Sequence, residues 1–196
     1  MPFLFHEPVR EKLPPCPLII YLHGRGEVLK KSNVGSAYFL IDGLVGLEKA
    51  DAAKSAYMAM PAGEFSPEEV NALVKSLCGQ YANIDQNRIY IIGYSDGARA
   101  LCEAIYWKPT LYAAAVPICG ALMSDPAVVK NIPTWVMQGG LDHPINVECA
   151  RAYYEIMLEV GSTVCKYTED PKWGHDFHTE TFKNQDLYTW LFAQHK

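Results

Sequence analysis

The chain has 196 residues, of which 49% are hydrophobic, and a formal net charge of −5. This length and composition predict a single domain over residues 1–196 with a sizeable core, and they exclude a disordered or fibrous protein. The acidic balance, without a run of lysine or arginine, excludes the charge pattern of a nucleic-acid or anionic-membrane binder. We expect a small or neutral partner, and the oligomeric state stays open.

The N-terminal apolar stretch MPFLF is too short for a signal peptide, and no stretch approaches the ~18 apolar residues of a membrane span. We therefore expect a soluble, cytoplasmic protein, while a mature secreted protein without its leader would look the same. The six cysteines show no CxxC spacing, which argues against a zinc or thioredoxin-like motif. We expect reduced, buried thiols and no metal.

Six short runs rich in β-forming residues are predicted as strands. Most are continuously apolar, which is typical of strands buried on both faces of a parallel sheet. In chain order the runs span residues 17–24, 55–63, 88–95, 113–120, 133–140 and 162–169.

Helical patterns separate these runs. Residues 66–77 begin with a capping box and continue with one apolar stripe. Apolar residues recur at helical spacing from Ala98 to Ile105 and from Ala150 to Leu158, where Gly161 is the stop signal. The alternation predicts an α/β fold, a three-layer, doubly wound and mostly parallel sheet.

In such sheets ligands bind beyond the carboxyl ends of the strands, so the residues that close each strand deserve inspection. One of them, Ser95, lies in GYSDGARA between glycines two positions on either side. A strand that must turn into a helix within about four residues places this serine at the apex of the turn, as in a nucleophile elbow. The alternative is a serine that only caps the helix.

A serine nucleophile needs a base, and the base needs an acid that orients it. Asp142 in QGGLDHPIN and His175 in PKWGHDFH follow later strand ends. The order Ser95, Asp142, His175 is the nucleophile, acid, base order of α/β-hydrolases. We therefore predict these three as the catalytic residues.

Each assignment has alternatives. Asp142 could instead cap the helix that begins near Asn146, with Glu148 and Asp170 as substitute acids. His175 could be a surface histidine, and His178 is its nearest rival. We expect His143 and His195 to be solvated, and His23 to be a buried, hydrogen-bonded residue at a strand end; Cys119 also closes a strand.

An oxyanion hole is the third requirement, because fixed donors must meet the charge of the tetrahedral intermediate. We predict the backbone NH of Asp96, directly after the nucleophile, as one donor. The segment LHGRGE supplies the backbone NH of Arg25 as the other, unless its glycines, Gly24 and Gly26, only make a turn. Candidate substrate-lining residues beside the site are Tyr94, His143 and Trp173.

Six blocks of the sequence together resemble a known group: PLIIYLHGRGE, NRIYIIGYSDGA, AAAVPICG, PTWVMQGGLDHPI, KYTEDPKWGHD and DLYTWLFAQ. They look like the small α/β-hydrolase carboxylesterases of the dienelactone hydrolase, phospholipase/carboxylesterase and polyhydroxybutyrate depolymerase-like superfamily. The resemblance implies the same triad, Ser95, Asp142 and His175, and the same oxyanion amides, Arg25 and Asp96.

Three departures from that group stand out. The nucleophile is a serine and not the cysteine of true dienelactone hydrolases. Position 96 carries a carboxylate, Asp96, which we expect to point away from the intermediate. The N-terminal strands are reduced to a few residues, FLFHEP, so a minimal sheet is expected.

These observations predict a serine carboxylic-ester hydrolase that works through an acyl-enzyme and needs no metal or organic cofactor. Only about 13 residues, 120–132, join two strands where a helical cap domain could be inserted, so we expect an open site without one. An open site favours short acyl or aromatic esters. The alternatives are a peptidase or acyltransferase with the same triad, or a non-catalytic small-ligand binder on the same fold.

Overall fold

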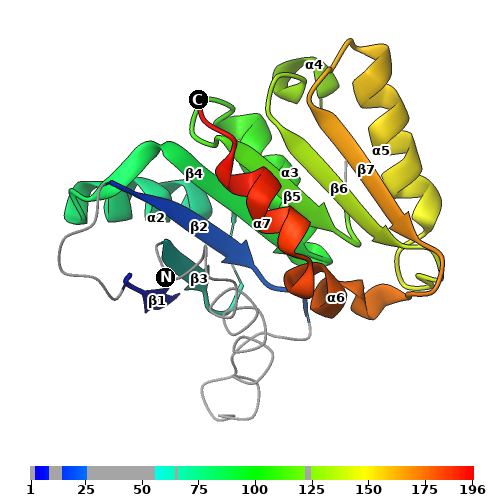
Figure 1. Cartoon of the computed structure of the whole chain (residues 1–196), viewed down its shortest axis with the longest axis horizontal. Helices are drawn as coiled ribbons and strands as arrows, with labels where there is room; N and C mark the ends of the chain where they lie inside the picture. The colour runs from blue at the N-terminus through cyan, green and yellow to red at the C-terminus, as the bar shows by residue number, and fades with distance from the viewer. Residues whose placement is uncertain (1–2, 9–14, 26–55, 65, 122–124) are drawn as a thin grey trace.

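The apolar runs form one seven-stranded sheet in the order β1-β3-β2-β4-β5-β6-β7 (Figure 1). This computed structural model describes residues 3–8, 15–25, 56–64, 66–121 and 125–196. The strands are β1 (Phe3–His6), β2 (Cys16–Leu22), β3 (Tyr57–Pro61), β4 (Ile84–Tyr94), β5 (Ala114–Ile118), β6 (Thr134–Gly139) and β7 (Cys165–Asp170).

Neighbouring strands from β3 to β7 pair in parallel, and only β1 runs antiparallel, with Phe3 opposite Pro61. The six predicted strands are therefore confirmed with shifted bounds. β4 begins four residues before the predicted start, and the short N-terminal segment contributes β1 at the edge.

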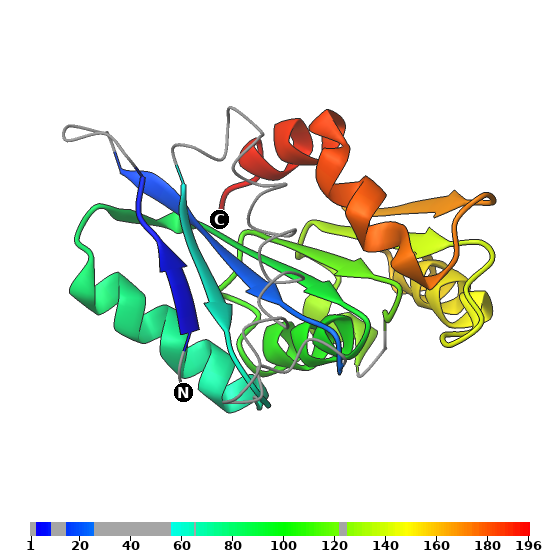
Figure 2. The same ribbon diagram turned by 90° about the horizontal axis from the view of Figure 1, so that it is seen from below.

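Helices cover both faces of the sheet (Figure 2). One layer holds α2, α3 and α5, and the other holds α6 and α7 (Figures 1 and 2). The bounds are α2 (Pro67–Gln80), α3 (Asp96–Trp107), α4 (Pro126–Val129), α5 (Val147–Glu159), a 3₁₀ turn η4 (His175–Phe177), α6 (His178–Lys183) and α7 (Gln185–Phe192). The predicted three-layer α/β fold is confirmed.

Side chains alternate between two apolar cores because successive residues of a strand point to opposite faces of the sheet. In β2, Leu18, Ile20 and Leu22 pack in one core with α2, α3 and α5. Ile19 and Tyr21 pack in the other core, which includes residues of α7. Burial on both faces explains why the strand sequences show no polar alternation.

The parallel register brings the carboxyl ends of the central strands to one edge of the sheet. Leu22 pairs with Gly93, Tyr94 with Ile118, and Gly139 with Asp170. The loops that follow β2, β4, β5, β6 and β7 therefore all leave from this edge. At the opposite end of β4, the backbone NH of Lys196 donates to the carbonyl oxygen of Asn87 at 3.1 Å.

Among the residues that the structure describes, no helix combines the length and the apolar character needed to cross a membrane.

Candidate active site

Ser95 occupies a sharp turn between β4 and α3. Its backbone has φ 55° and ψ −120°, and its side chain caps no amide of α3. Its NH donates to the carbonyl oxygen of Ile118 at 2.9 Å, which fixes the turn against β5. Gly97 is required here, because a Cβ at that position would lie 2.1 Å from the carbonyl oxygen of Leu22. The geometry is that of an elbow and disfavours the cap interpretation.

The structure brings Ser95, Asp142 and His175 into one hydrogen-bonded line. His175 Nδ1 lies 2.9 Å from Asp142 Oδ2, and His175 Nε2 lies 3.0 Å from Ser95 Oγ. A carboxylate can only accept, so Nδ1 donates to Asp142, and in the neutral ring Nε2 is left to accept the serine proton. The Asp142 side chain is wholly buried and that of His175 is 21% exposed, which leaves the imidazole edge accessible.

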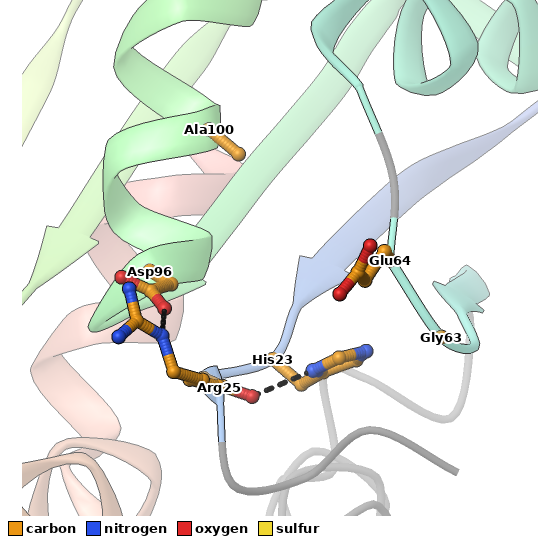
Figure 3. A pocket seen from close by; sticks show the side chains of 7 residues that line it. His23, Arg25, Gly63, Glu64, Asp96 and Ala100 are labelled. Carbon is orange, nitrogen blue, oxygen red and sulfur yellow. Dashed lines mark hydrogen bonds and ion pairs between the residues drawn. The ribbon is translucent and has the colours of Figure 1, made fainter. Parts of the chain in front are cut away.

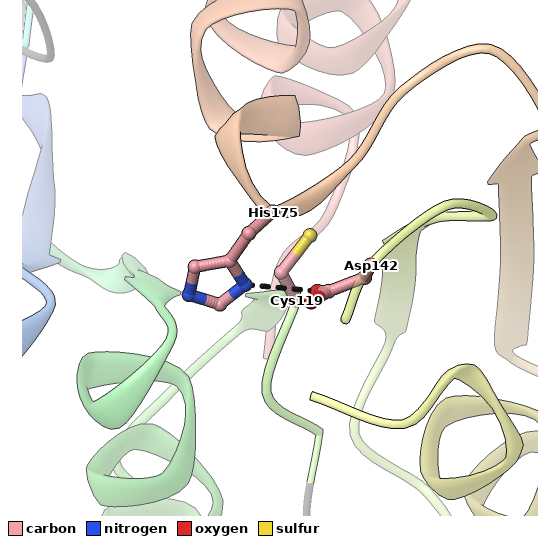
Figure 4. Close-up of side chains that lie close together, drawn as sticks. All are labelled: Cys119, Asp142 and His175. Carbon is pink, nitrogen blue, oxygen red and sulfur yellow. Dashed lines mark hydrogen bonds and ion pairs between the residues drawn. The ribbon is translucent and has the colours of Figure 1, made fainter. Parts of the chain in front are cut away.

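Three separate loops supply these side chains. Ser95 follows β4, Asp142 lies between β6 and α5, and His175 begins η4 after β7. The close-up of Asp142 and His175 shows the two side chains directed at one another (Figure 4). Their catalytic roles stay predictions, and the geometry is what a general-base pair requires.

The carboxylate of Asp142 is held by further donors. Gln138 Nε2 donates to Oδ2 at 2.9 Å, and the backbone NH of Ile145 donates to Oδ1 at 2.9 Å. The helix-cap alternative fails for α5, because the N-cap is Asn146, whose side chain accepts from the NH of Glu148. Asp142 therefore faces the imidazole with a fixed carboxylate.

The side chains of the other acids and of the rival histidine form their bonds elsewhere. Glu148 pairs with Arg151, and Asp170 Oδ1 accepts from the backbone NH of Lys172. His178 is buried, and its ring centroid lies 4.1 Å from that of Tyr94. His143 and His195 are exposed and His23 is buried, as the sequence predicts.

Cys119, the residue after β5, completes the surroundings of the acid. Its sulfur, an Asp142 oxygen and a His175 ring nitrogen lie within 4.8 Å of one another. Within the described ranges, this is the one group of side chains that could meet at a metal ion. Burial, with the neighbouring Asp142 carboxylate as a smaller cause, raises the pKa of the Cys119 thiol to about 12.

Sequence reasoning named Cys119 only as a strand-end residue and missed Gln138. The signal was available: Gln138 is the one amide side chain in the otherwise apolar run PTWVMQGG, directly before the loop of Asp142. A buried amide must find partners, so a glutamine in such a strand marks a polar contact.

The segment predicted to complete the oxyanion hole lies against the nucleophile. A Cβ added at Gly24 would lie 3.0 Å from Tyr94 Cδ1 and 3.3 Å from Ser95 Cβ. The side chains of Arg25 and Asp96 form an ion pair, with Nε 2.6 Å from Oδ2 (Figure 3). The roles of their two backbone amides stay predictions, and Gly26 lies outside the described residues.

The three candidate lining residues differ in exposure. Tyr94 is buried, and its ring centroid lies 5.1 Å from that of His175. Trp173 and His143 are exposed on the loops that carry His175 and Asp142. Leu141, also exposed, donates its NH to the carbonyl oxygen of Trp173 at 2.8 Å and joins these two loops.

A pocket of about 340 Å³ opens beside Arg25 and Asp96 (Figure 3). Its lining also includes His23, Gly24 and Glu64. Residues 122–124, in the segment where a cap domain is predicted to be absent, lie outside the described residues.

No protein-family model and no curated protein sequence matches the chain. Solved structures do match. A thermostable esterase has a TM-score of 0.83 at 27% identity, over 99% of this chain and 59% of that chain. The present chain thus spans 59% of the length of that esterase.

Two further structures match almost over their whole length. SOBER1 from Arabidopsis thaliana has a TM-score of 0.70 at 16% identity, over 90% of this chain and 98% of that chain. Est1E from Butyrivibrio proteoclasticus, in a structure with ferulic acid bound, has a TM-score of 0.69 at 14% identity, over 98% of this chain and 94% of that chain. With its parallel sheet, two helix layers and these likenesses, the chain has the α/β-hydrolase fold of these esterase structures.

Proposed function

We propose that the protein is a serine ester hydrolase that works through an acyl-enzyme, with Ser95 as nucleophile, His175 as base and Asp142 as the acid. The observation that carries this proposal is the continuous line of two hydrogen bonds, of 2.9 and 3.0 Å, from Asp142 through His175 to Ser95 Oγ. The esterase names of the structural relatives support the same reaction class.

In the first half-reaction, Ser95 Oγ attacks the acyl carbon while His175 Nε2 takes the hydroxyl proton. The wholly buried Asp142 side chain stabilises the imidazolium that forms. The backbone amides of Arg25 and Asp96 are proposed to bind the oxyanion. The tetrahedral intermediate then collapses, and His175 returns the proton to the leaving alcohol.

In the second half-reaction, water attacks the acyl-enzyme. His175 takes a proton from the water, the acyl–oxygen bond to Ser95 breaks, and the proton goes back to Ser95. The sum is an ester plus water giving an acid plus an alcohol, so no metal or organic cofactor enters the reaction.

We propose short acyl or aromatic esters as the substrate class. The imidazole edge is accessible, and the loops of Asp142 and His175 present Leu141 and Trp173 at 55% and 37% exposure. Within the described residues, such a rim supports an aromatic or small apolar group and gives little wall area for a long acyl chain. The ferulic acid bound to Est1E supports the aromatic class by analogy of fold alone.

Covalent labelling tests the mechanism. A fluorophosphonate probe should label the wild-type protein at Ser95 and leave Ser95→Ala unlabelled. A folded wild-type protein that the probe does not label would overturn the serine mechanism and favour a non-catalytic binder.

A panel of p-nitrophenyl and hydroxycinnamate esters tests the substrate class. We expect higher kcat/KM for acetyl, butyryl or hydroxycinnamoyl esters than for long-chain acyl esters. Faster turnover of the long-chain esters would refute this preference. Product analysis with peptides and with alcohols as acceptors detects peptidase or acyltransferase activity.

A further inference from the structure

The buried carboxylate of Asp142 has more donors than its contact with the imidazole requires. Oδ2 accepts from both His175 Nδ1 and Gln138 Nε2, each at 2.9 Å. Oδ1 accepts from the backbone NH of Ile145 at 2.9 Å. Gln138 is itself fully buried within β6, so this hydrogen bond is shielded from water.

Cys119 approaches the same carboxylate from the neighbouring strand. It is fully buried, and its sulfur lies beside Asp142 and His175 (Figure 4). Its backbone has a φ of 49°, and its NH donates to the carbonyl oxygen of Met137 at 2.9 Å. Ser95 and Cys119 are the only non-glycine residues with positive φ in the described part of the chain. Backbone strain of this kind concentrates at functional sites.

We propose that Cys119 and Gln138 are positioning residues that hold the carboxylate of Asp142 for catalysis. The amide fixes Oδ2 from the end of β6, and the thiol donates to the carboxylate from the end of β5. The amide and the thiol both spread the negative charge of Asp142. The carboxylate therefore attracts the imidazolium proton less strongly than it would if His175 were its only side-chain donor. This inference rests on the proposed function.

The variants Gln138→Met and Cys119→Ala each remove one donor with little change of shape. We expect each to lower kcat roughly tenfold, the size of a lost hydrogen bond to a charged group, with KM nearly unchanged because neither residue faces substrate. The acidic limb of the pH profile of kcat/KM, where activity falls as His175 is protonated, should move to higher pH. The reason is that a carboxylate with fewer donors holds the imidazolium proton more tightly. Cys119→Ser keeps a donor at this position. Unlike Cys119→Ala, it should therefore retain most of the wild-type kcat and the wild-type position of the acidic limb.

The groups that face this imidazole are few. Among the described residues they are Asp142, Cys119, Ser95 Oγ at 3.0 Å from Nε2, the ring of Tyr94 from β4, and behind that ring His178 of α6. Gln138→Met alters none of these groups, and Cys119→Ala alters only the thiol beside Asp142, so a shift of the acidic limb reports the surroundings of Asp142.

A merely structural role predicts a different pattern. Cys102→Ala, which removes a buried thiol of α3, is the matched control and should lower stability without moving the acidic limb. In an Asp142→Asn background, Gln138→Met and Cys119→Ala should cost little further kcat, because residues that act through one group are not additive. Full multiplicative losses there would overturn the positioning role.

A double-mutant cycle on urea unfolding separates this inference from the proposed function. We expect Cys119→Ala and Asp142→Asn to be coupled in the free energy of unfolding, whether or not the protein turns over esters. Coupling without fluorophosphonate labelling would reject the serine mechanism and, with it, the catalytic positioning. Labelling without coupling, or with unchanged kcat and acidic limb in both variants, would reject the positioning role alone.

Discussion

Arg25 Nε lies 2.6 Å from Asp96 Oδ2, and this ion pair joins the segment after β2 to the first residue of α3. The Arg25 side chain is 82% exposed and that of Asp96 is 34% exposed. Exposed pairs of this kind contribute only about 0–1 kcal/mol to stability. Here the pair also neutralises a carboxylate directly beside the nucleophile, where an unpaired negative charge would oppose the oxyanion.

The charge argument predicts an asymmetric effect of two neutral substitutions. Arg25→Gln should lower kcat about tenfold, or roughly 1.4 kcal/mol, because Asp96 then keeps only the longer ion pair with Arg99, at 3.7 Å, beside the developing charge. Asp96→Asn should cost less, and the double variant should be faster than Arg25→Gln alone. The differences should shrink at high salt in steady-state assays. A double variant as slow as the product of both single losses would contradict this account.

The hydrogen-bonded line predicts that the nucleophile and base act as a unit. Ser95→Ala and His175→Ala should each lower kcat roughly 10⁴-fold or more, and the double variant should be little worse than either. Single-turnover and steady-state assays on a p-nitrophenyl ester measure kcat of the two single variants and of the double variant. Losses that multiply in the double variant would show that the two residues act independently.

The bonds of the three acids predict which of them supports the base. Asp142→Asn should be severe, with a loss near 10⁴-fold in kcat, because an amide in place of the carboxylate favours the wrong imidazole tautomer. Glu148→Gln and Asp170→Asn should each change kcat by less than about twofold, since these carboxylates bond to Arg151 and to the backbone NH of Lys172, and an amide oxygen can still accept both bonds. A mild loss in Asp142→Asn with a severe one in either of the others would reassign the acid.

Close packing between the end of β6 and the loop of His175 makes Gly139 irreplaceable. A Cβ at Gly139 would lie 2.1 Å from the carbonyl oxygen of Gly174, the residue before His175. Gly139→Ala must therefore displace this loop, and a shift near 1 Å should cost about 10²-fold in kcat.

Gly79, in α2, is the matched control for this substitution. A Cβ there meets no heavy atom within 4 Å. Gly79→Ala should raise the free energy of unfolding by about 0.5–1 kcal/mol and leave kcat unchanged. Thermal unfolding and kcat measured on Gly139→Ala and Gly79→Ala check these two predictions. A wild-type kcat in Gly139→Ala would refute the packing argument.

The sequence predicts most of the fold because the central strands are buried on both faces. Their continuous apolar runs, such as LIIYL and IYII, separate them from the amphipathic helices at α2 and α3. The location of the candidate site follows from the same pattern, since parallel strands present their carboxyl ends at one edge. Ser95, Asp142 and His175 each follow a predicted strand, so their proximity was predictable from the order of elements.

Short elements and contacts fixed by tertiary structure escape this reasoning. β1 has four residues, and its partner β3 begins 51 residues after β1 ends, at Tyr57. α7 has eight residues, too few for a repeated apolar period, yet it buries Leu187, Tyr188 and Leu191 against the sheet. The thiol of Cys119 meets Asp142 only because β5 and β6 are neighbours, and no spacing along the chain encodes that contact.

The hydrogen bond between Lys196 and Asn87 has a practical consequence. It anchors the last residue of the chain at the end of β4 that lies opposite Ser95 (Figure 1). A carrier protein or solid support attached at Lys196 would therefore lie at the edge of the sheet opposite Ser95. The mouth of the proposed site would then face the surrounding medium, which makes this edge of the sheet the natural point for immobilisation.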